Sequence, residues 1–235
     1  MVRIFISVLL IVITTFCSAQ IGKIKLPTSL NPSKLSESDI ADGLKQALTI
    51  GAQNASQVLN RKDGFNGNPL VHIPFPPDAQ KVEKSLRDLG YRTKVDSFTT
   101  SLNRAAEQAA KEAAPIFTDA VKQMTLTDAS GILKGSDTAA THYLRDKTYN
   151  PLYNAFKPHV QTALDNHEVD KKWTELTTIY NKIPFVKHVQ TDLIAYTNNK
   201  ALQGVFVTLA GEEKKIRTNP AAQTTELLKK VFGNQ

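Results

Sequence analysis

The fold is decided by residues 98–124, which read FTTSLNRAAEQAAKEAAPIFTDAVKQM. Their apolar side chains recur at spacings of three and four, the pattern of one face of an α-helix. The residues of this face are Phe98, Leu102, Ala105, Ala106, Ala109, Ala113, Ile116, Phe117, Ala120 and Met124. Because half of them are alanine, a partner helix can approach closely. Pro115 interrupts the face, since proline lacks the N–H and clashes with the preceding turn, so we predict two helices or one kinked helix.

The same periodicity predicts helices along most of the chain beyond Leu35. The expected helices are 38–60, 77–89, 95–114, 115–124, 127–133, one opened by Ser136 or Asp137, one that begins at Asn150-Pro151, 168–181, 191–217 with a break at Asn198-Asn199, and 221–232. No repeat of fixed period and no convincing strand ladder accompany them. We therefore predict an all-α fold, a single multi-helix domain of eight to ten helices.

Residues 61–77 depart from the helical pattern. Asp63-Gly64 and Asn66-Gly67 are turn signals, and the three prolines of the run LVHIPFPP exclude a helix and a central strand. We expect this proline-rich segment to lie extended across the helices, as an edge strand or a polyproline stretch. Its expected anchors are Phe65, Leu70, Ile73 and Phe75.

The beginning of the chain has the composition of a secretory signal peptide. Arg3 precedes an apolar run over residues 4–16, and Cys17-Ser18-Ala19 supplies the small residues of a cleavage site. A retained anchor is less favoured, because a spanning helix needs about 20 apolar residues. We expect cleavage between Ala19 and Gln20 and a periplasmic or secreted protein. A lipoprotein anchored through Cys17 is less favoured, since bulky Phe16 stands directly before the cysteine.

The predicted organisation is a signal peptide (1–19), an N-terminal linker (20–34) and a helical domain of unknown function (35–233). Cleavage removes the single cysteine, so disulfides and thiolate chemistry are excluded from the mature chain. The formal net charge of +7 suggests anionic partners, but the basic residues are interleaved with acids, which favours a role in solubility. Nucleic acid is not expected, because no platform of aromatic and basic residues appears. No transmembrane helix is expected in the mature chain.

Several short blocks make this sequence similar to a bacterial family known as domain of unknown function 4197. The blocks are Asp63-Gly64-Phe65 with Asn68-Pro69 and Ile73-Pro74, Asn103-Arg104-Ala105-Ala106-Glu107, Pro115-Ile116-Phe117, Gly135-Ser136-Asp137-Thr138-Ala139-Ala140-Thr141, and Glu212-Glu213-Lys214-Lys215-Ile216-Arg217 with Asn219-Pro220-Ala221-Ala222. The resemblance covers about residues 35–233. It implies an exported protein of a Gram-negative envelope, and it implies no activity and no catalytic residues.

No pattern in the sequence nominates a catalytic, metal or cofactor site. The histidines are His72, His142, His159, His167 and His188, and none stands in an H-E-x-x-H motif. Acids surround His167, but a solvated connection between helices explains them better than a zinc or calcium site. Nucleophile-elbow and phosphate-loop motifs do not occur. We therefore predict no cofactor and no metal.

The most polar group on the central helix is Asn103, Arg104 and Glu107. At 100° per residue, Asn103 and Glu107 lie together on one flank of the helix, and Arg104 lies farther round. If the helix is central, both flank residues are buried and need partners. We predict that the partner of Glu107 comes from another helix. A structural polar network is favoured, and ligand binding by these three residues is the alternative.

Basic residues near the C-terminus form a second candidate site. Lys214, Lys215 and Arg217 could make an anion-binding or membrane-surface patch. The favoured alternative is ordinary helix chemistry, in which cations stabilise a helix C-terminus and Glu213 pairs with Arg217 at i, i+4.

These observations leave three hypotheses for function. The first is a non-enzymatic exported helical protein that binds a ligand or a protein partner in the bacterial envelope; the partner is unknown. The second is a hydrolase-type enzyme whose site assembles from several helices, which a pocket with convergent buried acids or histidines would favour. The third is a peripheral membrane-surface protein, which a basic face beside exposed apolar residues would favour.

Overall fold

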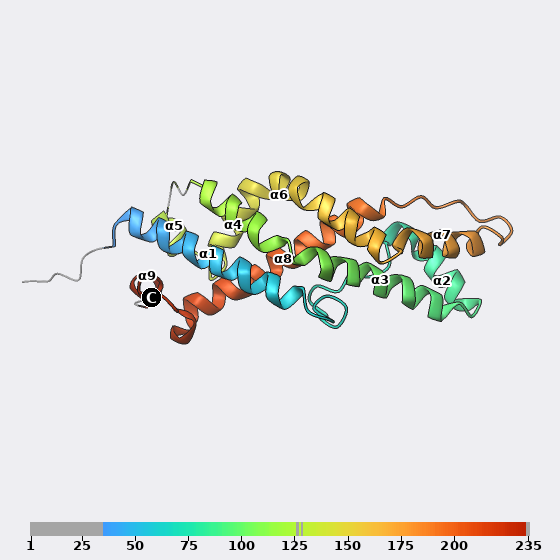
Figure 1. The fold of residues 1–235 in the computed structure, drawn as a ribbon, viewed down its shortest axis with the longest axis horizontal. Coiled ribbons are helices and arrows are strands. Elements are labelled where there is room, and N and C mark those ends of the chain that lie inside the picture. The colour runs from blue at the N-terminus through green and yellow to red at the C-terminus, as the bar shows by residue number, and fades with distance from the viewer. Residues whose placement is uncertain (1–34, 126, 128, 234–235) are drawn as a thin grey trace, which may run out of the picture. The chain divides into compact units, whose positions relative to one another are not determined.

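The computed structural model describes residues 35–125, 127 and 129–233. Within these ranges the chain forms nine α-helices and two short 3₁₀ helices and no strand, so the all-α prediction is confirmed (Figure 1). The elements are α1 (Glu37–Leu59), η1 (Pro77–Ala79), α2 (Gln80–Asp88), α3 (Arg92–Ala110), α4 (Ala113–Gln123), α5 (Ala129–Leu133), α6 (Ala139–Asn166), α7 (Val169–Tyr180), α8 (Leu193–Thr218), η2 (Pro220–Ala222) and α9 (Glu226–Phe232). The predicted signal peptide and linker lie outside the described residues. Among the helices described, none has the length and apolar character needed to cross a membrane.

The stretch that decides the fold forms two helices, α3 and α4, as its proline predicts. α3 ends at Ala110 and not at the predicted Ala114. The reason is that Pro115 has no N–H to donate to the carbonyl of Lys111, one turn earlier. α3 packs against α6, α7 and α8, and α4 packs against α1 and α6. The Phe117 ring is fully buried and meets the ring of Phe206 on α8 edge-on at 5.1 Å. Both helices contribute fully buried side chains to the core, such as Phe98 and Leu102 from α3 and Phe117 from α4.

The structure corrects the prediction of a helix boundary at Asn150-Pro151. α6 runs without interruption through Pro151 and Pro158. Each proline removes one backbone hydrogen bond, but Leu152 and Phe156 are buried against the core and hold the helix on both sides of Pro151. Packing therefore outweighs the local signal.

The predicted break in α8 at Asn198-Asn199 is also wrong. Asn198 Nδ2 donates to the carbonyl of Tyr153 at 3.1 Å, and Asn199 Oδ1 accepts from the Tyr149 hydroxyl at 2.8 Å. Both asparagines thus bond to α6 and do not compete with the backbone of their own helix. The last helix begins later than predicted, at Glu226.

Residues 61–77, called the cover segment below, pack against the helices, but the predicted extended run is shorter than expected, because residues 69–71 form a turn and no strand is present in the segment. Phe65, Ile73 and Phe75 are buried, but Leu70 is 78% exposed and is not an anchor. The carbonyl of Asn68 accepts from the N–H groups of Val71 and His72, so the backbone turns here and Val71 takes the inward position. A side chain at residue 70 then points to solvent.

α8 approaches the cover segment closely at Gly204. A Cβ at this position would lie 2.6 Å from the Phe65 ring, so a larger residue would displace the cover segment. The Tyr196 hydroxyl donates to the carbonyl of Pro74 at 2.9 Å. Burial raises the pKa of Tyr196 to about 12, so this hydroxyl stays protonated and keeps its donor.

Candidate functional site

Asn103 binds the cover segment as a neighbouring strand would. Its side chain is fully buried, Oδ1 accepts from the Ile73 N–H at 2.8 Å, and Nδ2 donates to the Ile73 carbonyl at 2.8 Å. Nδ2 also donates to the Thr99 carbonyl in its own helix. Because the following residue, Pro74, has no N–H, this segment can form few backbone bonds. One amide side chain satisfies both polar groups of Ile73.

Glu107 binds the same segment one helical turn away. Its side chain is buried, and Oε1 accepts from the N–H groups of Phe65 at 3.1 Å and Asn66 at 3.0 Å. Oε2 accepts from Arg104 Nη1 at 2.6 Å. The buried carboxylate therefore has a cation and two backbone donors, which compensates the cost of burying its charge.

The structure corrects the predicted partner of Glu107. The partner is Arg104 of the same helix, together with backbone donors of the cover segment, rather than a residue of another helix. Arg104 Nη2 also pairs with Asp63 Oδ1 at 2.8 Å. Bonds from Asn66 and Arg104 lower the pKa of Asp63, and the bond to Glu107 raises the pKa of Arg104. The hydrogen bonds of all three predicted residues go to the chain itself, which favours their structural role.

A second buried carboxylate, Glu213 on α8, caps the start of α6. Oε1 accepts from the Ala140 N–H at 3.0 Å, and Oε2 accepts from the Thr141 N–H at 2.7 Å and its hydroxyl at 2.6 Å. These N–H groups belong to the first turn of a helix, where no intrahelical acceptor exists. A negative charge there also meets the positive end of the helix dipole.

Arg217 completes this second network. Its Nε pairs with Glu213 at 2.9 Å, the i, i+4 ion pair that the sequence predicts. Its two Nη atoms donate to the carbonyls of Leu133 and Ile132 at the end of α5, and its guanidinium lies 5.5 Å from the centre of the Phe232 ring. The ion pair between Glu213 and Arg217 on α8 therefore bonds to the start of α6 and to the end of α5.

The predicted C-terminal basic patch is thus reduced to two lysines. Arg217 is only 7% exposed and cannot contribute to a surface patch. Lys215 pairs with Glu212, and Lys214 is exposed. The structure does not place the three cations on one face.

Histidines and acids do not converge anywhere in the parts of the chain that the structure describes. No group of three such residues is arranged to hold a metal ion there. His167 stands apart from the others because burial and nearby Lys172 lower its pKa, which keeps the ring neutral. A neutral, half-buried ring of this kind is typical of a packed connection between helices.

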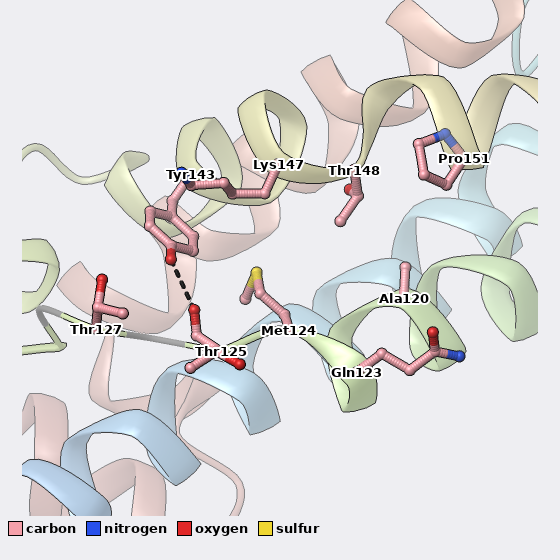
Figure 2. Close-up of a pocket in the computed structure, with 9 residues that line it drawn as sticks. All are labelled: Ala120, Gln123, Met124, Thr125, Thr127, Tyr143, Lys147, Thr148 and Pro151. Atoms are coloured by element: carbon pink, nitrogen blue, oxygen red, sulfur yellow. Dashed lines mark hydrogen bonds between the residues drawn. The ribbon is translucent and has the colours of Figure 1, made fainter.

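An open pocket lies between the end of α4 and the first half of α6 (Figure 2). Its volume is about 400 Å³. Of the residues that the structure describes, nine line it: Ala120, Gln123, Met124, Thr125, Thr127, Tyr143, Lys147, Thr148 and Pro151. Met124 is buried, and the Tyr143 hydroxyl donates to the Thr125 carbonyl at 2.6 Å, which joins the two walls.

The pocket combines an apolar floor with one positive charge. Lys147 is the charged residue among the nine, and its ammonium lies 5.7 Å from the centre of the Tyr143 ring. This arrangement suits a small molecule with an apolar body and an anionic head.

Sequence reasoning did not find this pocket. Tyr143, Lys147 and Pro151 are spaced by four and share one face of α6, which is a readable signal. Because the sequence predicts a helix boundary at Asn150-Pro151, that prediction assigns Pro151 to a different helix from Tyr143 and Lys147. The opposite wall comes from α4, more than a full helix earlier in the chain, and its position needs the packed structure.

A model of the family described as "Protein of unknown function (DUF4197)" matches residues 34–233. No curated protein and no solved structure matches the chain. Four of the five blocks that carry the resemblance meet in space as two pairs: 63–65 with 103–107, and 135–141 with 212–217. Both pairs are the buried carboxylate networks, so the fold itself accounts for them.

Proposed function

The chain belongs to the family described as "Protein of unknown function (DUF4197)", a membership that carries no activity, and we propose that it is a non-enzymatic exported protein that binds a small amphiphilic organic anion. The binding site is the pocket between α4 and α6. The observation that carries this proposal is that, among the described residues of the pocket wall, Lys147 is the one cation beside an apolar floor and no acid is present. A carboxylate or similar head would pair with Lys147, and its apolar body would lie on Met124 and Ala120.

The hydrolase alternative has less support. Hydroxyl groups line the pocket at Thr125, Thr127 and Thr148, but no histidine, aspartate or glutamate stands among its nine residues to activate them. The Thr148 hydroxyl already donates to the Leu144 carbonyl. Binding without chemistry is the function that this set of side chains supports best.

Replacing Lys147 with methionine should weaken the binding of decanoate about tenfold, equivalent to about 1.4 kcal/mol. Methionine keeps most of the length and apolar surface of the side chain and removes its charge. Binding of decanol, which has the same chain and no charge, should change little. Isothermal titration calorimetry on the purified protein measures both affinities.

The matched control is Lys157→Met, which removes a charge from an exposed lysine of the same helix outside the pocket. It should leave decanoate binding unchanged. Ala120→Phe should reduce the binding of decanoate and decanol together, because the larger ring fills the pocket. If the wild-type protein does not bind decanoate, or if both lysine variants behave alike, this pocket is not an anion site.

The location proposed for this function is the bacterial envelope, reached after cleavage between Ala19 and Gln20. The support is the apolar run over residues 4–16 and the family resemblance. N-terminal sequencing of protein purified from its own cells should therefore begin at Gln20. A mature chain that starts with Met1, or with a lipidated Cys17, would contradict this proposal.

A further inference from the structure

The loop between α7 and α8 presents an aromatic side chain entirely to solvent. Phe185 is 105% exposed, more than any other large apolar residue in the described ranges. Its backbone has φ of 64°, in the left-handed region. A bulky residue is strained there, whereas glycine or asparagine is tolerated. The backbone strain at Phe185 thus lowers the stability of the fold, and its exposed ring makes no packing contribution that compensates for this.

The loop that carries Phe185 is packed and hydrogen-bonded to the helical domain, although Phe185 itself is exposed. Ile183, Val186 and Val189 pack against the core on either side of it. The Ile183 N–H donates to the Tyr180 carbonyl, and the Thr191 hydroxyl donates to Asp78 Oδ2 at 3.1 Å, which joins the far end of the loop to η1. The loop is fastened on both sides of the aromatic ring. Strained residues held this way by their surroundings are typical of functional sites.

The charged side chains within the loop that carries Phe185 are lysines. Residues 181–191 contain Lys182, Lys187 and His188 and no acid, and these three side chains are exposed. By contrast, several lysines of the neighbouring helices are paired with acids, as Lys94 is with Glu175 and Lys84 is with Asp88. A cationic loop with a projecting aromatic ring is therefore a local exception on a surface of mixed charge.

A second exposed apolar turn lies at the same end of the helical domain. α3 and α7 run antiparallel, because Phe98 meets Trp173 while Lys94 meets Glu175. The turn between α2 and α3 is therefore near the end of α7, and Figure 1 shows that turn and the α7–α8 loop at one end of the helices. This turn exposes Leu89. The apolar area is thus not confined to one side chain.

We propose that this end of the protein docks on an anionic lipid surface, with the Phe185 ring inserted among the headgroups and Lys182 and Lys187 paired with lipid phosphates. A projecting ring fits a soft interface, whereas a protein partner would need a matching cavity. Aromatic rings favour the headgroup region, and each lysine near an anionic surface adds a favourable electrostatic contribution. The site differs from the C-terminal lysines that the sequence suggested, and it is independent of the pocket between α4 and α6.

The test is co-sedimentation with two kinds of vesicle, one of phosphatidylglycerol and phosphatidylethanolamine and one of phosphatidylcholine alone. The wild-type protein should bind the anionic vesicles, bind the neutral ones weakly, and dissociate as salt is raised. Phe185→Asn should weaken binding to anionic vesicles about tenfold or more, and should keep or raise the unfolding midpoint because asparagine tolerates the left-handed backbone. The double change Lys182→Gln with Lys187→Gln should weaken binding and reduce its salt dependence.

Two controls locate the effect. Leu70→Asn removes another highly exposed apolar side chain from a different loop, and the pair Lys214→Gln with Lys215→Gln removes two exposed charges from α8. Neither control should change vesicle binding. The proposal is overturned if the wild-type protein does not bind anionic vesicles, if Phe185→Asn binds them as well as wild type, or if the α8 lysine pair has the larger effect.

Discussion

Replacing Glu213 with alanine should lower the free energy of unfolding by about 3–5 kcal/mol, the usual cost of removing one partner from a buried ion pair. The change leaves the guanidinium of Arg217 buried without its carboxylate. It also removes the acceptor for the Ala140 and Thr141 N–H groups at the start of α6. Chemical denaturation followed by circular dichroism measures the loss.

Glutamine is the informative second substitution at residue 213. It matches the shape of glutamate, but the four groups around the side chain are all donors, so its NH₂ must face another donor. Glu213→Gln should therefore also destabilise. The control is Glu226→Gln, which breaks an exposed ion pair with Lys229 on α9 and should leave stability unchanged. A loss below about 1 kcal/mol for Glu213→Ala would mean that the network does not hold the domain together.

Replacing Glu107 with glutamine should lower the free energy of unfolding by about 2–3 kcal/mol, the range for hydrogen bonds to a charged group. The expected loss is smaller than at Glu213 because Arg104 is 24% exposed and can be hydrated when its partner is lost. The single oxygen of glutamine can accept either from the Phe65 and Asn66 N–H groups or from Arg104, so its NH₂ faces a donor on the other side and the attachment of the cover segment should weaken. Limited proteolysis within residues 61–77 should become faster in the variant.

The matched control is Asp63→Asn, because Asp63 pairs with the same Arg104 but is largely exposed. Asparagine also tolerates the positive φ of 66° at this residue. This variant should change stability far less than Glu107→Gln. If Glu107→Gln keeps its stability and loses a co-purifying ligand, then Asn103, Arg104 and Glu107 form a binding site rather than a structural network.

The parts of the fold that were predictable depend on local chemistry. The boundary between α3 and α4 follows from Pro115, and the capping box at Ser36 and Asp39 opens α1 as its residue pattern indicates. Burial of Asn103 and Glu107 followed from the position of the central helix. Their partners did not, because these are backbone groups brought in by the cover segment, whose path no helical period describes.

The errors arise where packing between distant segments outweighs a local signal. Pro151 is typical of a helix start, yet the buried residues on both sides hold α6 in one piece. Leu70 fits an extended anchor by hydrophobicity, but the turn at Asn68 gives the inward position to Val71. The pocket was missed for the same reason, since its two walls come from α4 and α6 and meet only in the folded chain.

The cap that Glu213 provides has a consequence for the order of folding. The N–H of Ala140 at the start of α6 can bond to Glu213 only after 73 more residues have been synthesised. The carbonyl of Leu133 at the end of α5 likewise needs Arg217, which lies 84 residues later in the chain. In a nascent chain, the end of α5 and the start of α6 therefore lack these hydrogen-bond partners until the C-terminal part of α8 has been synthesised. If the chain is exported through a membrane channel, as we propose above, this late closure would leave it unfolded enough for transport, and folding would be completed only after α8 has emerged.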